Sequence, residues 1–175
     1  MIAVKEIVLA RVNPTGLVFT PDLYEAYRAY VDLSSVSASR LPSDVKLRLS
    51  RIVRKPGILW EQQDLDHATY LRASDARGSV LFPGTYGNKD IAGITHGTLI
   101  VIADSVLSDN TCNKYATFAH ELTHIFQNRR DGENSFLTKY LLDASHYSYR
   151  NIPYEAEAFA LQDNVLNNYC LQIMR

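Results

Sequence analysis

Residues 112–132 read CNKYATFAHELTHIFQNRRDG, and this stretch decides the fold. Ala119, Leu122 and Phe126 recur at helical spacing, so they give the segment one apolar side. Two arginines and then a glycine end it, with the basic residues where a helix C-terminus favours positive charge and the glycine just beyond. The pattern therefore predicts a long helix over 112–128.

The middle of this helix carries His120-Glu121-Leu122-Thr123-His124, which is the motif HExxH. Positions four apart lie on one face of a helix, so both imidazoles can reach a single metal ion while Glu121 stands beside it. A catalytic zinc ion takes three protein ligands and leaves its fourth position to water. We therefore expect Zn²⁺ on His120 and His124, with Glu121 as the general base that takes the proton of the attacking water. The alternative is an accidental match in a helical protein.

A third ligand has to come from elsewhere, and residues 151–158, which read NIPYEAEA, offer two carboxylates. Glu155 and Glu157 are rotated from one another by about 200° on a helix, so they cannot both face the metal. From the residues alone, one of the two is expected to bind while the other is solvated.

The combination of HExxH with a later Glu-x-x-Ala resembles the gluzincin arrangement of zinc metallopeptidases. That resemblance implies Glu155, followed by Ala158, as the third ligand. A closer resemblance, through residues 98–100, 120–127 and 152–158, is to the small bacterial zincin-like domains grouped as DUF4157, and it implies a metallopeptidase scaffold more firmly than a substrate.

The chain departs from this pattern at one position. Related zincins often carry Asp or Asn directly after the small residue, where it can orient a histidine ligand, but here that residue is Phe159. Another group must then supply the hydrogen bond to the histidine. Asp163, Asn113 and backbone carbonyls are the candidates.

Peptide hydrolysis also needs a hydrogen-bond donor that stabilises the oxyanion. In the zincins that this chain resembles, the donor often comes from the segment after the first helix. Residues 146–150, HYSYR, supply Tyr149 and then Tyr147 as candidates, although both could simply pack with their hydroxyls in water. The β-branched stretch around 97–101 could hold a substrate by main-chain pairing or be a plain sheet strand. His96 and His67 have no partner at metal-ligand spacing, so we place them outside the site.

Elsewhere the periodicity predicts a mainly helical first part with a later sheet. A strand over 3–12 is followed by helices over 21–34 and from Pro42 to about Pro56, with a weaker helical pattern over 58–76. Strands are expected between Ile91 and Ile102, and further helices over 133–145 and 153–174. The expected fold is α+β and zincin-like: a helical support over 1–77, and over 78–175 a small, mostly antiparallel sheet, the HExxH helix and the glutamate helix.

Length and composition favour one domain. The chain has 175 residues, of which 46% are hydrophobic and 21% charged, with a formal net charge of −1. A nearly balanced charge offers no basic patch to nucleic acid, and no apolar run is long enough to cross a bilayer. We expect neither nucleic acid nor a membrane as a partner.

Cys112 and Cys170 are too few for a disulfide framework and form no CxxC pair, so we expect both to be buried and free. Residues 1–13 lack the apolar core of a secretory signal. A cytoplasmic location is therefore expected, with export by a dedicated apparatus left open.

The sequence thus predicts a zinc metallopeptidase acting on a peptide or protein substrate, with the oligomeric state open. Two alternatives remain. One is a zincin-fold interaction or cargo protein whose zinc is structural. The other is an effector or toxin protease of narrow specificity.

Overall fold

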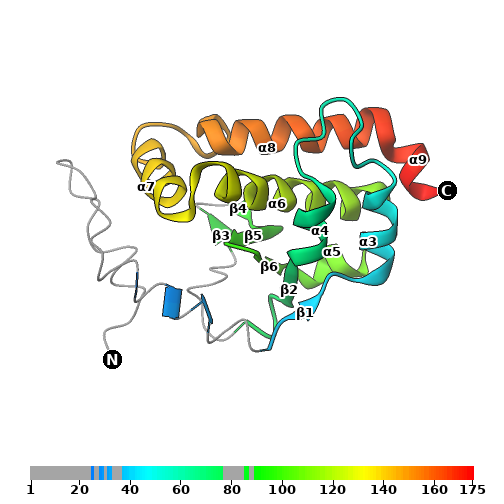
Figure 1. Ribbon diagram of the computed structural model, residues 1–175, viewed down its shortest axis with the longest axis horizontal. Helices are drawn as coiled ribbons and strands as arrows, with labels where there is room; N and C mark the ends of the chain where they lie inside the picture. The colour runs from blue at the N-terminus through cyan, green and yellow to red at the C-terminus, as the bar shows by residue number, and fades with distance from the viewer. Residues whose placement is uncertain (1–24, 26–27, 30, 33–36, 77–84, 87–88) are drawn as a thin grey trace.

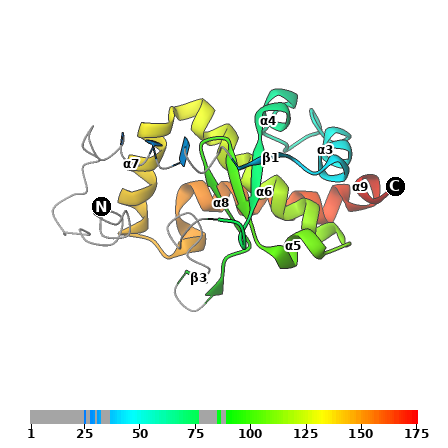
Figure 2. The same cartoon turned by 90° about the horizontal axis from the view of Figure 1, so that it is seen from below.

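A computed structural model describes residues 25, 28–29, 31–32, 37–76, 85–86 and 89–175 of the chain. It is an α+β fold with mostly helices and a small mixed sheet. Figure 1 shows the HExxH helix, α6 (Cys112–Asp131), lying between the strands and a second long helix, α8 (Pro153–Asn164). The same layers are seen from below in Figure 2, where the strands cross the near side of α6.

The sheet has four strands in the order β1 (Ser39–Arg40), β2 (Thr69–Arg72), β6 (Leu99–Ile102) and β5 (Gly93–His96). β6 pairs with β2 in parallel and with β5 in antiparallel orientation, and β1 pairs with β2 antiparallel. β5 is thus an edge strand. A separate antiparallel pair consists of β3 (Thr85–Tyr86) and β4 (Lys89–Asp90).

The central strand β6 reads Leu-Ile-Val-Ile, and all four residues are buried, as expected for a strand covered on both faces. Alternate side chains enter different clusters. Ile100 and Ile102 pack with the helices, whereas Leu99 and Val101 pack on the opposite face with Val31. The helix-side cluster is the main core, and α6 contributes Tyr115, Ala116, Phe118, Ala119, Leu122 and Ile125 to it.

Two further helical units complete the site region. α7 (Glu133–Ala144) begins directly after Gly132, whose φ of 78° turns the chain between α6 and α7. After a 3₁₀ turn at Tyr149–Asn151, Pro153 opens α8, which continues through one π-helical segment (Val165–Tyr169) into α9 (Cys170–Met174).

Most of the expected elements are confirmed. The helix over 112–128 exists and extends by one turn, to Asp131; those over 133–145 and 153–174 and the strand near 98–102 are also present. Ser43–Ser50 forms α3, which is followed by turns before Pro56. Residues 25, 28–29 and 31–32 are helical, and the rest of the 21–34 helix, like the 3–12 strand, lies outside the described residues.

The helical prediction for 58–76 is wrong over its second half. A short helix, α4 (Gln62–His67), ends at Ala68, which adopts extended geometry, and β2 follows. The side chains of β2 include a threonine and a tyrosine, which favour a pleated strand, and its backbone pairs along the whole length of β6. The first 77 residues therefore supply strands β1 and β2 as well as helices.

The prediction of two free cysteines is also wrong. Cys112 and Cys170 form a disulfide with a Cα–Cα distance of 5.7 Å. Cys112 opens α6 and Cys170 opens α9, so folding brings together two residues that are 58 positions apart in the chain. The bond ties the first turn of the HExxH helix to the C-terminal helix.

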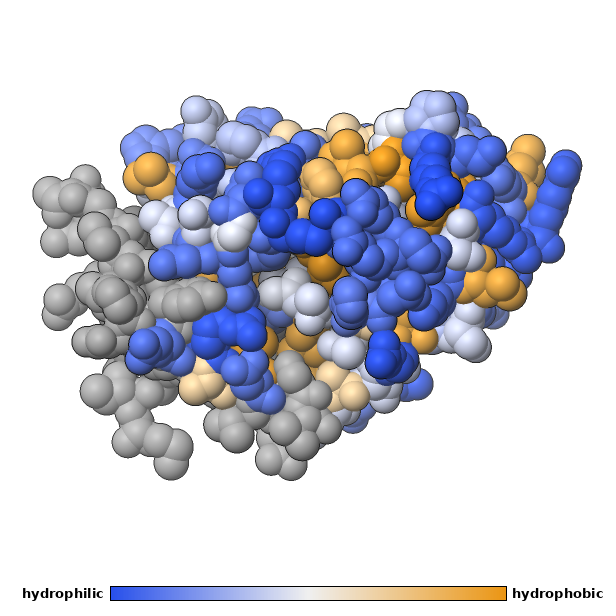
Figure 3. Space-filling view, in the orientation of Figure 1, coloured by the Kyte–Doolittle hydropathy of each residue, from blue (hydrophilic) through white to orange (hydrophobic). Residues whose placement is uncertain are grey.

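The surface in the view of Figure 3 is mainly hydrophilic, with smaller hydrophobic patches between the polar side chains. Among the described residues, none of the helices combines the length and the apolar composition needed to cross a membrane.

Candidate metal centre

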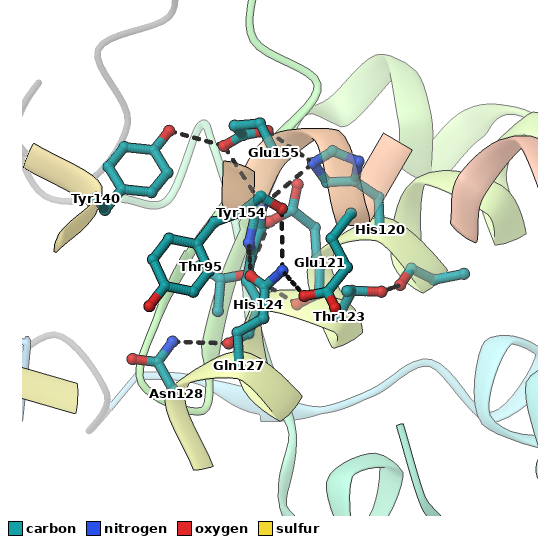
Figure 4. A network of polar contacts seen from close by, with 12 residues as sticks. Thr95, His120, Glu121, Thr123, His124, Gln127, Asn128, Tyr140, Tyr154 and Glu155 are labelled. Atoms are coloured by element: carbon teal, nitrogen blue, oxygen red, sulfur yellow. Dashed lines mark hydrogen bonds and ion pairs between the residues drawn. The ribbon is translucent and has the colours of Figure 1, made fainter. Parts of the chain in front are cut away.

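α6 supplies two imidazoles on one face. His120 and His124 are one turn apart, and their Nε2 atoms lie 3.2 Å from each other. Both residues are buried, with 4% of His120 and 6% of His124 exposed. The helix places them there because the intervening Leu122 points into the core cluster on another side of α6. Figure 4 shows the two rings turning toward the same point.

The third member of the group is Glu155, in the first turn of α8. The fully buried Ile152 anchors the start of that helix, and Pro153 is its first residue. Glu155 Oε2 lies 3.2 Å from His120 Nε2, and Oε1 lies 3.5 Å from His124 Nε2. The Tyr140 hydroxyl of α7 donates a hydrogen bond of 2.7 Å to Oε1. Three helices thus converge on one carboxylate.

The spacing of these donor atoms fits a metal ion. Ligands at 2.0–2.1 Å from a tetrahedral zinc ion are about 3.3 Å from one another. His120 Nε2 lies 3.2 Å from His124 Nε2 and 3.2 Å from Glu155 Oε2, whereas His124 Nε2 lies 3.5 Å from the other carboxylate oxygen, Oε1. With one ligand atom taken from each residue, the three atoms lie within 4.8 Å of one another. In addition, Glu155 Oε2 is buried and accepts no hydrogen bond from any residue that the structure describes. His120, His124 and Glu155 therefore form a buried group that could hold a metal.

The charges within this group stabilise one another. Burial raises the pKa of Glu155, but the contacts and charges of His120 and His124 outweigh burial and hold that pKa well below its usual range. Burial lowers the pKa of His124, but the hydrogen bond and charge of Glu155 outweigh it and raise the pKa from 6.5 to about 9. A cation is thus favoured at this position, whether it is a proton or a metal ion.

Glu121, between the two histidines, lies against the edge strand β5. Thr95 donates a hydrogen bond of 2.7 Å from its hydroxyl to Glu121 Oε2. On the same face of β5, Gly93 is so close that an added Cβ would stand 2.6 Å from Glu121 Oε1. Burial of this carboxyl raises its pKa above the usual value. The arrangement suits a group that accepts a proton.

The other carboxylate of the NIPYEAEA stretch points elsewhere. Glu157 accepts a hydrogen bond of 2.8 Å from Gln127 Nε2 and pairs with the Arg130 guanidinium at 3.1 Å. The helix rotation that brings Glu155 to the histidines carries Glu157 to the side of α8 that faces the end of α6. The structure therefore brings Glu155, and not Glu157, to the histidines.

The two tyrosines expected from HYSYR do not reach the histidines through any described contact. The Tyr147 side chain is 51% exposed. The ring of Tyr149 packs edge-on against Phe159, with centroids 5.9 Å apart, and Phe159 in turn packs against His120 at 4.6 Å. Tyr140, which sequence reasoning did not select, is the tyrosine whose hydroxyl contacts the site. In the sequence, Tyr140 is recognisable only as one residue of the apolar face of α7.

The hydrogen-bond partner of His124 was missed as well. Gln127 Oε1 lies 2.7 Å from His124 Nδ1, whereas the two polar candidates named from sequence, Asp163 and Asn113, have exposed side chains. The position of Gln127, three residues after His124, is the signal that could have found it. Phe159 packs against the ring of His120, and His120 Nδ1 has no hydrogen-bond partner among the described residues.

His96 and His67 do not belong to the group. His96 is buried in β5, His67 is exposed at the end of α4, and neither is a member of the histidine–glutamate cluster.

Comparisons with models of protein families, with curated proteins and with solved structures found no match. The case for a function therefore rests on the geometry of this cluster.

Proposed function

We propose that the protein is a zinc-dependent peptidase in which His120, His124 and Glu155 hold the metal. The observation that carries the proposal is that these three buried side chains each place one ligand atom within 4.8 Å of the other two. Two imidazoles and one carboxylate are a ligand set that zinc enzymes use for hydrolysis. When bound, zinc would polarise a carbonyl and lower the pKa of a water molecule to about 7.

Glu121 is the general base in this proposal. Its carboxylate is fixed by Thr95, which leaves it little freedom to swing away from the attacking water. The raised pKa of the buried carboxyl makes Glu121 a better proton acceptor than a solvated glutamate at neutral pH. The same group would then deliver the proton to the leaving amine.

Stabilisation of the oxyanion needs a hydrogen-bond donor, and three tyrosines are candidates. Tyr149 and Tyr147 stay predictions from the sequence. Tyr140 is a further candidate, since its hydroxyl already stands 2.7 Å from Glu155 Oε1 and could donate to a neighbouring substrate oxygen after a small rotation.

A second candidate function is a structural metal site without turnover. It is favoured by one observation: Glu121 and Glu155 are each only 3% exposed. A substrate has to reach Glu121, whereas a structural ion needs closed surroundings. This reading predicts that zinc stabilises the protein while no peptide is cleaved.

Metal content tests the site itself. We expect about one zinc per chain by plasma mass spectrometry after reconstitution. Glu155→Ala should lose most of this zinc, and Asp163→Ala, which removes an exposed carboxylate from the same helix, is the matched control that should keep it. A protein that takes up no zinc would contradict the proposal.

Turnover tests the peptidase. Glu121→Gln should keep its zinc and lose about 10²- to 10⁴-fold in turnover on a peptide library read by mass spectrometry. Cleavage that survives this substitution would exclude Glu121 as the base. Zinc binding without any cleavage by the wild-type protein would favour the structural site.

A further inference from the structure

Gln127 is fully buried, and both its amide nitrogen and its amide oxygen have polar partners. Its amide nitrogen donates to the backbone oxygen of Tyr154 at 2.9 Å and to Glu157 Oε2 at 2.8 Å. Both partners are acceptors only, since one is a carbonyl and the other is a carboxylate paired with Arg130. Reversing the amide would set its oxygen against two other oxygens.

The amide oxygen must therefore face His124 Nδ1, which lies 2.7 Å away. An amide oxygen can only accept, so Nδ1 has to carry the hydrogen. In a neutral ring the lone pair is then on Nε2, the atom that faces His120 and Glu155. Gln127 thus selects the tautomer of His124 that can bind a metal.

The same amide also connects the two ligand-bearing helices. Tyr154 directly precedes Glu155 in the first turn of α8, and Gln127 is on α6. The hydrogen bond from Gln127 to Tyr154 O therefore fixes the position of Glu155 relative to His124. In Figure 4, dashed lines join the side chain of Gln127 to both His124 and Tyr154.

We propose that Gln127 is a positioning residue of the metal site and that this position requires an amide rather than a carboxylate. This inference rests on the proposed function. Metal-bound histidines commonly donate to a carboxylate or to a backbone carbonyl. Here a carboxylate could accept from His124, but its second oxygen would meet Tyr154 O and Glu157 without a hydrogen to share.

The test is the zinc dissociation constant, measured by competition with a chromogenic chelator, together with the visible absorption spectrum after loading with Co²⁺. Gln127→Leu should weaken zinc binding by about 10- to 100-fold, the usual effect of losing a partner of a metal-bound histidine, and should change the Co²⁺ spectrum. Gln172→Leu is the matched control, because Gln172 also donates to a backbone carbonyl, that of Arg51, at a place outside the metal cluster.

An exchange of the two side chains keeps the test decisive if one variant folds poorly. Gln127→Glu should weaken zinc binding at least as much as Gln127→Leu. The double variant Gln127→Glu/Glu157→Gln should recover at least tenfold of that loss, because the amide introduced at position 157 would then donate to the carboxylate introduced at position 127. A merely space-filling role for Gln127 predicts no such recovery.

Four outcomes overturn the inference. One is Gln127→Leu binding zinc within threefold of wild type with an unchanged Co²⁺ spectrum. Another is Gln127→Glu binding as well as wild type. A third is a double variant that recovers none of the lost zinc affinity. In these three, a wild type that binds zinc leaves the proposed function standing. A wild type that binds no zinc overturns the proposed function and this inference together.

Discussion

Thr95 and Gly93 show how single residues of β5 prepare Glu121. They are two positions apart on a strand, so both face α6, whereas Ile94 between them packs on the opposite side of the sheet. Thr95 gives the carboxylate a hydrogen bond, and Gly93 leaves space for it. A side chain at position 93 would push Glu121 out of its place.

Thr95→Val should lower turnover while zinc binding stays unchanged. The substitution keeps the shape of the side chain and removes a hydrogen bond to a charged group, which contributes about 1.5–3 kcal/mol. We expect a loss of about 10- to 100-fold in kcat, measured on the best cleaved peptide. Thr95→Ser keeps the hydroxyl and should keep most of the activity. Equal kcat in Thr95→Val and wild type would contradict this role.

The raised pKa of His124 makes the stability of the zinc-stripped protein depend on pH. The folded value of about 9 exceeds the ordinary 6.5, so this stabilisation is complete below pH 6.5 and is lost as the pH rises through 9. The depressed pKa of Glu155 acts at the other end, where its stabilisation is lost only in acid, below the ordinary value of 4.5. The melting temperature of stripped protein should therefore fall between pH 6.5 and 9.

Two controls define this result. His124→Gln removes the titrating ring, so its melting temperature should show a smaller fall over the same interval. Zinc-loaded protein should show no such fall, because a His124 ring that binds the metal is already deprotonated. A stripped wild type that becomes more stable toward pH 9 would contradict the assignment.

At the scale of elements, α6 is held at both ends by contacts to segments distant in sequence. Its first turn is joined to α9 by the disulfide between Cys112 and Cys170. Near its last turn, Arg129 forms two hydrogen bonds, of 2.9 and 3.0 Å, to the buried Asp64 of α4. The histidines lie between these two attachments. α6 is therefore a fixed base on which α8 places Glu155.

Removing the disulfide should destabilise the protein without removing the metal. The bond closes a loop between positions 58 apart, and a bond of this kind contributes roughly 2–4 kcal/mol to the free energy of unfolding. We expect Cys112→Ser/Cys170→Ser to unfold at lower urea than the oxidised wild type, with zinc stoichiometry unchanged. Dithiothreitol should shift the wild-type midpoint in the same direction and leave the double variant unaffected. Free thiols in the unreduced wild type would contradict the pairing.

At the scale of the whole molecule, the candidate metal group connects elements that are otherwise separate. α6 supplies two ligands, α8 supplies one, α7 supplies the tyrosine beside it, and the edge strand β5 supports Glu121. An ion at this place would bind the folded chain and not the unfolded one, so it would add to the stability of the whole fold.

Removing zinc should therefore lower the melting temperature. At a free zinc concentration a thousand times the dissociation constant, binding adds about 4 kcal/mol, which corresponds to about ten degrees for a protein of this size. Calorimetry of reconstituted protein, with and without a strong chelator, measures the difference. Glu155→Ala should respond much less. A wild-type melting temperature that does not change with zinc would contradict a buried metal site.

Local periodicity explains why part of this structure could be predicted from the sequence. The turn geometry of a helix alone brings His120 and His124 together, and the same periodicity predicted α6, α7 and α8 closely. It also showed that Glu155 and Glu157 cannot share a site. The choice of Glu155 over Glu157 came instead from a resemblance to a protein family. Periodicity could not make this choice, because the rotation of one helix relative to a second helix is not a local property.

The tertiary structure decided what depends on contacts between distant segments. These include the pairing of β2 with β6, the disulfide, and the partners of the site residues: Thr95 for Glu121, Tyr140 for Glu155, and Gln127 between His124 and Tyr154. Apart from the three-residue spacing between His124 and Gln127, none of these pairings has a fixed spacing in the sequence. The sequence determined the helices and the two imidazoles by itself, since a backbone period places them, whereas the surroundings that orient them depend on how separate elements pack.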